Sequence, residues 1–172
     1  MKKLLLILLS FTILFTNCNN LSNCNYNNLS EVLIKKDSRN IGIDISICKV
    51  EDNKIIIDMI AINSDKSRSD VFGYILQVAE ELREENFERI EFASKGQTKF
   101  YITGRYFKKL GDEYGWQNVV YINRTFPENV KNIDGTYAFS SWTGGALGVL
   151  NKQLDDQLEF HNQWYINDKT ID

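Results

Sequence analysis

Isoleucine at every second position from Ile41 to Ile47 is the feature that most constrains the fold. Glycine, aspartate and serine stand between these isoleucines, so only one face of the segment is apolar, as in a half-buried β-strand. A polar turn at 51–53 leads into 54–63, which is apolar on both faces and predicts a central strand. Two strands joined by so short a turn predict a β-hairpin.

The pattern then changes to helical spacing. Apolar residues recur on one helical face at Val71, Ile75, Val78 and Leu82. They predict a helix that Ser69 or Asp70 caps and that runs to about residue 85. Alternation on either side of a turn at 95–97 predicts a second hairpin.

The rest of the chain predicts a helix at 104–114, a strand at 119–124, a last short strand at 137–139 and a final helix ending near 163. The apolar stripe of that final helix consists of Leu147, Leu150, Leu154, Leu158, His161 and Trp164 or Tyr165. We expect this stripe to pack at the core, with the histidine at its edge. Together these elements predict an α+β fold with two layers, in which about three helices cover one face of a mainly antiparallel sheet.

The N-terminus predicts the destination of the protein. Lys2 and Lys3 precede an apolar run at 4–15, which is too short to span a bilayer as a helix of about 20 residues. A basic start followed by a short apolar run is typical of a secretory signal peptide.

The end of this run, Phe15-Thr16-Asn17-Cys18, resembles the lipobox of bacterial lipoproteins. The resemblance implies cleavage before Cys18 and acylation of its thiol, and hence membrane anchoring at the bacterial cell envelope. The domain would then face the periplasm or the cell exterior. The organisation is a signal peptide at 1–17, an Asn-rich tether at 18–30 and one domain at 31–172. If Cys18 is not lipidated, the same signal predicts secretion.

The remaining cysteines and the charge limit the partners. Cys24 and Cys48 can form a disulfide in an oxidising compartment or stay as two free thiols, and the sequence leaves both open. With one histidine and no CxxC motif, neither a metal site nor a cofactor is expected. The chain carries 20 basic and 23 acidic residues, so nucleic acid is not an expected partner.

Two groups of residues are candidates for ligand binding. Small residues before the final helix (Trp142, Thr143, Gly144 and Gly145) could receive an anion at a helix N-terminus, or simply allow a tight turn. Aromatic residues interleaved with basic ones (Tyr101, Tyr106, Trp116 and again Trp142) could stack on a glycan or a protein partner, or belong to the core.

These features favour a membrane-anchored binding or interaction module whose partner is a protein or a glycan. One alternative is an immunity-type or accessory protein of an envelope system. Another is an envelope hydrolase that pairs Ser141 with His161, although the GxSxG motif of such enzymes is absent.

Overall fold

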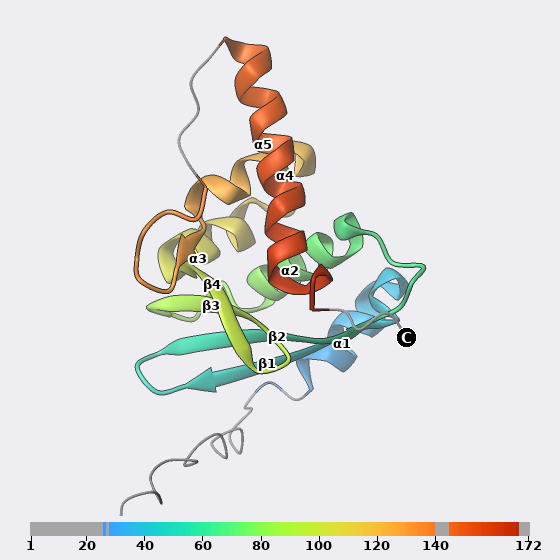
Figure 1. Cartoon of the computed structure of the whole chain (residues 1–172). Helices are drawn as coiled ribbons and strands as arrows, with labels where there is room; N and C mark the ends of the chain where they lie inside the picture. The colour runs from blue at the N-terminus through green and yellow to red at the C-terminus, as the bar shows by residue number, and fades with distance from the viewer. Residues whose placement is uncertain (1–25, 27, 140–144, 169–172) are drawn as a thin grey trace, which may run out of the picture.

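The computed structural model describes residues 26, 28–139 and 145–168, in which helices cover one face of a five-stranded sheet (Figure 1). The α-helices are α1 (Leu29–Lys36), α2 (Arg68–Glu81), α3 (Gly104–Glu113), α4 (Val119–Thr125) and α5 (Ala146–His161). The strands are β1 (Ile43–Val50), β2 (Lys54–Ile62), β3 (Arg89–Ser94), β4 (Gln97–Thr103) and β5 (Lys131–Asn132). Single helical turns are η2 (Ser38–Asn40), η3 (Phe126–Asn129) and η4 (Asn162–Ile166).

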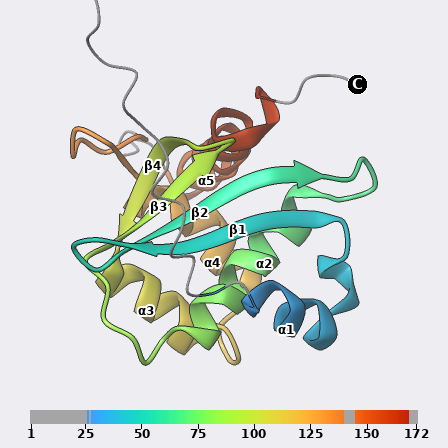
Figure 2. The same cartoon turned by 90° about the horizontal axis from the view of Figure 1, so that it is seen from below.

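The strands follow one another across the sheet in chain order, β1-β2-β3-β4-β5. The pairs β1–β2, β3–β4 and β4–β5 are antiparallel, whereas β2 and β3 are parallel and are connected through α2. Seen from below, the sheet lies in front of the helices (Figure 2). The predicted α+β class, the two layers and the mainly antiparallel sheet are confirmed.

Both predicted hairpins are present, and their turns explain their register. Asp52 and Asn53 take φ values of 61° and 54° between β1 and β2, a left-handed conformation that these two residue types tolerate well. The register sets Ile45 opposite Met59 and Ile47 opposite Ile57. Side chains alternate along a strand, so these residues all face the helices and are buried.

Helix α2 is confirmed, but it begins earlier than predicted. Ser67 is the N-cap, and its hydroxyl accepts a hydrogen bond from the Asp70 backbone N–H at 3.2 Å. The Asp70 carboxylate in turn accepts from the Ser67 backbone N–H at 2.9 Å, which completes a capping box. The prediction of Ser69 or Asp70 as the cap was therefore wrong, because Asp70 is the reciprocal partner of the true cap.

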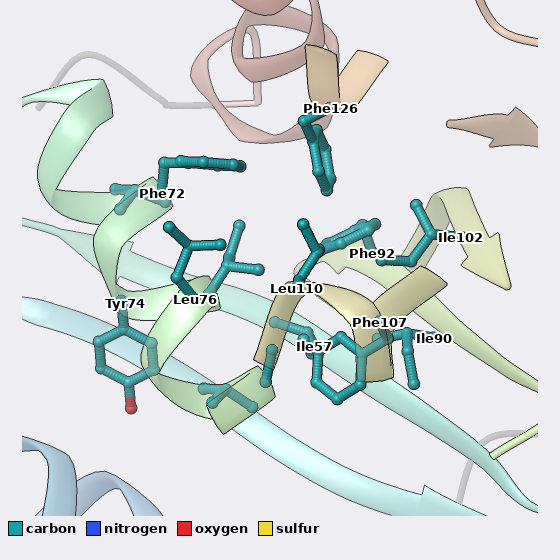
Figure 3. Close-up of a cluster of buried hydrophobic side chains, with 14 of the residues drawn as sticks. Ile57, Phe72, Tyr74, Leu76, Ile90, Phe92, Ile102, Phe107, Leu110 and Phe126 are labelled. Carbon is teal, nitrogen blue, oxygen red and sulfur yellow. The ribbon is translucent and has the colours of Figure 1, made fainter. Parts of the chain in front are cut away.

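The core lies between the sheet and the helices (Figure 3). The buried side chains labelled there come from both layers: Ile57, Phe72, Tyr74, Leu76, Ile90, Phe92, Ile102, Phe107, Leu110 and Phe126. The centroid of the Phe126 ring lies 5.1 Å from that of Phe72, 5.9 Å from that of Phe92 and 5.0 Å from that of Phe160, and all three contacts are edge-on. This ring contact joins α2, β3 and α5 around η3.

The predicted strand at 119–124 is wrong, because this segment forms α4. The Asn118 side-chain oxygen accepts from the backbone N–H groups of Val120 at 2.9 Å and Tyr121 at 3.4 Å, which caps the helix. Ile122 and Phe126, four residues apart, then point into the core. The predicted strand at 137–139 is also wrong: it amounts to a single bridge between Lys131 and Tyr137.

Helix α1 begins at Leu29, inside the segment predicted as a tether, and Leu29 packs against the core. Tyr26 precedes it and donates a hydrogen bond to the Glu85 carboxylate at 2.6 Å. None of the helices in the described ranges has the combined length and hydropathy that crossing a bilayer requires.

Candidate binding site

Helix α5 packs with polar residues toward the protein and leucines toward solvent. Leu147, Leu154 and Leu158 are 77%, 42% and 46% exposed, and Leu150 is half-buried. We call these four residues the leucine stripe. Apart from Phe160, the buried residues of α5 are polar: Gln153, Asp156, Gln157 and His161. The prediction that the stripe packs at the core was therefore wrong for its leucines, although His161, Trp164 and Tyr165 are buried.

Two aromatic side chains decide which face of α5 is buried. Phe160 and Trp164 contact Phe92 of β3 edge-on, with ring centroids 5.4 Å and 5.1 Å away. The Trp164 indole N–H donates to the Ala93 carbonyl oxygen at 2.7 Å. A buried tryptophan or phenylalanine removes more apolar surface from water than a leucine does. The helix is therefore rotated to bury the rings, and the leucines are turned outward.

Hydrogen bonds and ion pairs hold the buried face of α5. The Gln153 side chain accepts from the Arg124 guanidinium of α4 and donates to the Glu128 carboxylate of η3 at 2.5 Å. Asp156 forms an ion pair with Lys152, one turn earlier on the same helix. These contacts satisfy the Gln153 and Asp156 side chains on the buried face of α5.

The N-terminal half of α5 projects beyond the rest of the fold. Figure 1 shows its first turns extending past α4 and away from the sheet. Every residue from Ala146 to Lys152 is exposed or half-buried. The leucine stripe thus begins on a helix segment that has water on most of its sides.

The stripe ends at a pocket, because Leu158 also forms part of the pocket wall. The pocket lies between the end of β2, the start of α2 and η4, and its volume is about 370 Å³. Its wall residues are Ile62, Lys66, Ser67, Arg68, Ser69, Leu158, Tyr165 and Ile166. We call it the α2–η4 pocket. Its wall combines apolar side chains with two cations.

Arg68 is the more exposed cation at this pocket, and it contacts an amide of η4 rather than an acid. Its guanidinium donates to the Asn162 side-chain oxygen at 3.3 Å. Asp70, the nearest acid on its own helix, is occupied by the Ser67 cap. No ion pair of Arg68 is found within the described part of the chain. Lys66 differs, since its ammonium lies 3.5 Å from the Asp65 carboxylate.

His161 lies behind the pocket wall and is 1% exposed. Its Nε2 is 3.0 Å from the Gln157 side-chain nitrogen, and its ring contacts the rings of Phe160 and Tyr165 edge-on. Burial, together with the nearby Arg68 charge, lowers the pKa of His161 to about 3. The imidazole is therefore neutral at physiological pH. The His161 Nδ1 and the Gln157 side-chain oxygen are both buried without a hydrogen-bond partner among the described residues.

The ligand-binding candidates from the sequence occupy different elements. Tyr101 of β4 stacks against the Arg89 guanidinium at 5.0 Å. Tyr106 of α3 packs on Phe126, and burial raises the pKa of its phenol. Trp116, in the α3–α4 connection, is 71% exposed and donates its indole N–H to the Asp112 carbonyl oxygen at 2.8 Å. Gly145 is the N-cap of α5. The three aromatic residues have different contact partners on different parts of the fold.

Several predicted site residues lie outside the described ranges: Cys18, Cys24, Ser141, Trp142, Thr143 and Gly144. Cys48 is described; it is buried on β1 and disulfide-bonded. Its Sγ also lies 3.4 Å from the Ser46 hydroxyl. The identity of its partner as Cys24 stays a prediction.

The sequence reasoning missed Arg68 and Tyr165 as neighbours in a pocket. A signal for the first was present: Ser67-x-x-Asp70 is a capping-box spacing and places 66–69 at a helix start. The approach of η4 to that start depends on how α5 is rotated, which periodicity does not give.

Within the described residues, no group of three or more His, Cys, Asp or Glu side chains is arranged to hold a metal ion. Comparison with protein-family models, curated proteins and solved structures gives no match.

Proposed function

We propose that this chain is an envelope-anchored interaction module that binds a protein partner through the leucine stripe of α5. The observation that carries the proposal is the exposure of Leu147, Leu154 and Leu158 on a helix that projects from the fold. Burying a leucine side chain contributes about 1.5–3 kcal/mol, so covering the stripe would supply substantial binding free energy.

The spacing of the stripe indicates the kind of surface it fits. Leu147, Leu150, Leu154 and Leu158 follow the one-face spacing of an amphipathic helix that lies in an apolar groove. Asp155 and Glu159 are exposed next to the stripe in sequence. A partner groove with a basic rim would complement these acids, whereas a second copy of α5 would bring like charges together.

The proposed location rests on the lipobox resemblance. An acyl group on Cys18 would hold the domain at the membrane surface, where it would meet a partner of the envelope. An immunity or accessory system is one setting in which such a module would act. The hydrolase alternative stays a prediction that no described contact of His161 supports, since this neutral imidazole touches Gln157 and aromatic rings.

The partner surface can be tested by site-specific photo-crosslinking in the producing bacterium. A crosslinker at position 147 or 154 is expected to capture a defined envelope protein. A crosslinker at Ile41, which is 55% exposed between η2 and β1, is the matched control and is expected not to capture it.

The identified protein is then purified, and its affinity is measured for the unmodified protein and for Leu154→Ser. We expect about tenfold weaker binding for Leu154→Ser and no change for Ile41→Ser. Equal capture from all three positions, or a dimer of this chain as the only product, would overturn the proposal. Labelling with a palmitate analogue, lost in Cys18→Ala, tests the anchor independently.

A further inference from the structure

The wall of the α2–η4 pocket combines aliphatic side chains with positively charged ones. Ile62, Leu158 and Ile166 supply aliphatic surface, whereas Lys66 and Arg68 supply positive charge. A volume of about 370 Å³ is at the lower end of the range for small-molecule sites. The pocket therefore fits a small molecule with one apolar and one polar end.

The charge of Arg68 lacks a carboxylate partner in the described ranges, although the protein is acidic overall. Some other cations in the fold are paired with acids: Lys36 contacts Glu80 and Glu81 at 2.6 Å and 2.8 Å, and Arg39 contacts Asp37 at 2.7 Å. Among the described residues, the Arg68 guanidinium has the neutral Asn162 amide as its one hydrogen-bond partner. It keeps donors for an anion, and guanidinium is well matched to a carboxylate.

The second observation concerns Tyr165, which η4 contributes to the pocket wall. It is 3% exposed and forms part of the pocket wall, yet its hydroxyl makes no hydrogen bond to any described residue. Burial raises the pKa of its phenol to about 12, so the hydroxyl keeps its proton and can donate. A hydroxyl in the pocket wall that has no protein partner is open to a ligand atom, to which it can donate a hydrogen bond.

We propose that the α2–η4 pocket binds a small amphipathic carboxylate, whose acid group contacts Arg68 and Tyr165 and whose aliphatic chain covers Ile62, Leu158 and Ile166. The capping box at the start of α2 occupies the backbone N–H groups of Ser67 and Asp70. The side chains supply the recognition. This site shares Leu158 with the leucine stripe, but its polar contacts, Arg68 and Tyr165, lie outside the stripe through which the chain is proposed to bind a protein.

Octanoate is a suitable probe, with acetate and octan-1-ol as matched controls that lack the chain or the charge. Binding to the purified protein is measured by calorimetry and by the methyl NMR signals of Ile62 and Ile166. We expect saturable binding of octanoate, and binding at least about tenfold weaker for acetate and octan-1-ol.

Variants separate the proposed contacts from general hydrophobic adsorption. Arg68→Gln is expected to weaken octanoate binding about tenfold, and Tyr165→Phe to weaken it severalfold. Arg105→Gln removes another exposed arginine, on α3, and is expected to leave octanoate binding unchanged. Arg68 is exposed, so Arg68→Gln should leave thermal unfolding unchanged. If Tyr165→Phe fails to fold, the octanoate affinity of Arg68→Gln alone tests the proposal.

Three outcomes would overturn the proposal: octan-1-ol binding as tightly as octanoate, unchanged binding in Arg68→Gln, or signal changes at Leu147 and Leu154 in place of Ile62. Leu154→Ser is expected to keep octanoate binding. Failure of the pocket proposal can therefore be distinguished from failure of the protein-binding proposal.

Discussion

Gly111 of α3 lies against the backbone of Ala79 in α2, so close that a Cβ on Gly111 would stand 2.2 Å from the Ala79 carbonyl oxygen. Real side chains do not approach a carbonyl oxygen so closely, and a fixed helix backbone cannot move aside cheaply. The absence of a side chain at Gly111 therefore sets how near α3 packs to α2.

This contact predicts opposite effects for two glycine substitutions. Gly111→Ala should lower the free energy of unfolding by about 1–3 kcal/mol, because α3 must move away from α2. Gly73→Ala, in the middle of α2, meets nothing within 4 Å and should raise it by about 0.5–1 kcal/mol. Urea unfolding measures both, and a neutral Gly111→Ala would show that the two helices are not in tight contact.

The exposure of the leucine stripe predicts that its residues contribute little to folding. Leu147→Ser should change the free energy of unfolding by no more than about 0.5 kcal/mol, because this side chain is largely in water. Phe160→Ala removes a fully buried ring and should cost about 3–5 kcal/mol. Thermal and urea unfolding test the pair. A large loss in Leu147→Ser would mean that α5 packs through its leucines after all.

Burial of His161 predicts a stability that depends on pH. The pKa of His161 falls from 6.5 to about 3 on folding, so below pH 6.5 the unfolded chain binds a proton that the folded protein does not. The free energy of unfolding should therefore fall as pH drops from 6.5 toward 3, by about 1 kcal/mol between about pH 7.5 and about pH 5.5. Urea unfolding at both pH values measures the loss. His161→Gln is the control and should lose less over the same interval.

Asn40 connects α1 to α2 and predicts a coupled loss of stability. Its side-chain amide donates to the Leu33 carbonyl oxygen at 2.8 Å and to the Gln77 side-chain oxygen at 2.7 Å. Asn40→Ala leaves the Gln77 oxygen without this donor and the Leu33 carbonyl with only its bond from the Asp37 N–H, and should cost about 1–3 kcal/mol. Asn151→Ala, on the exposed face of α5, is the matched control and should be nearly neutral.

The same network gives a second test through additivity. Gln77 donates onward to the Asp37 carboxylate at 2.9 Å, so Asn40 and Gln77 act together. The double variant Asn40→Ala, Gln77→Ala should be less destabilised than the sum of the single variants. Simple additivity of the measured unfolding free energies would contradict a shared network.

Local patterns in the sequence were enough to predict the two hairpins, α2 and α3. The alternation of Ile43, Ile45 and Ile47 needs only one sheet face to be buried, and the structure provides that face. The segment at 119–124 misled the prediction because valine, tyrosine and isoleucine favour strands. The Asn118 cap and the burial of Ile122 and Phe126 outweigh that preference.

The candidate site was only partly predictable for a related reason. Periodicity identified the leucines of α5 as one stripe, but two different faces of this helix carry apolar side chains. Which one is buried depends on contacts of Phe160 and Trp164 with Phe92, far away in the sequence. The pocket beside Arg68 and Tyr165 follows from that same rotation.

The parallel pairing of β2 with β3 also bears on how the chain folds. Each hairpin joins neighbouring segments, whereas the parallel pair sets Lys54 opposite Arg89, with the whole of α2 between them. Closing so long a segment costs chain entropy before any contact is gained. We therefore expect the two hairpins to form early and independently, and their union along β2 and β3, with α2 docked above, to limit the rate at which the native protein is reached.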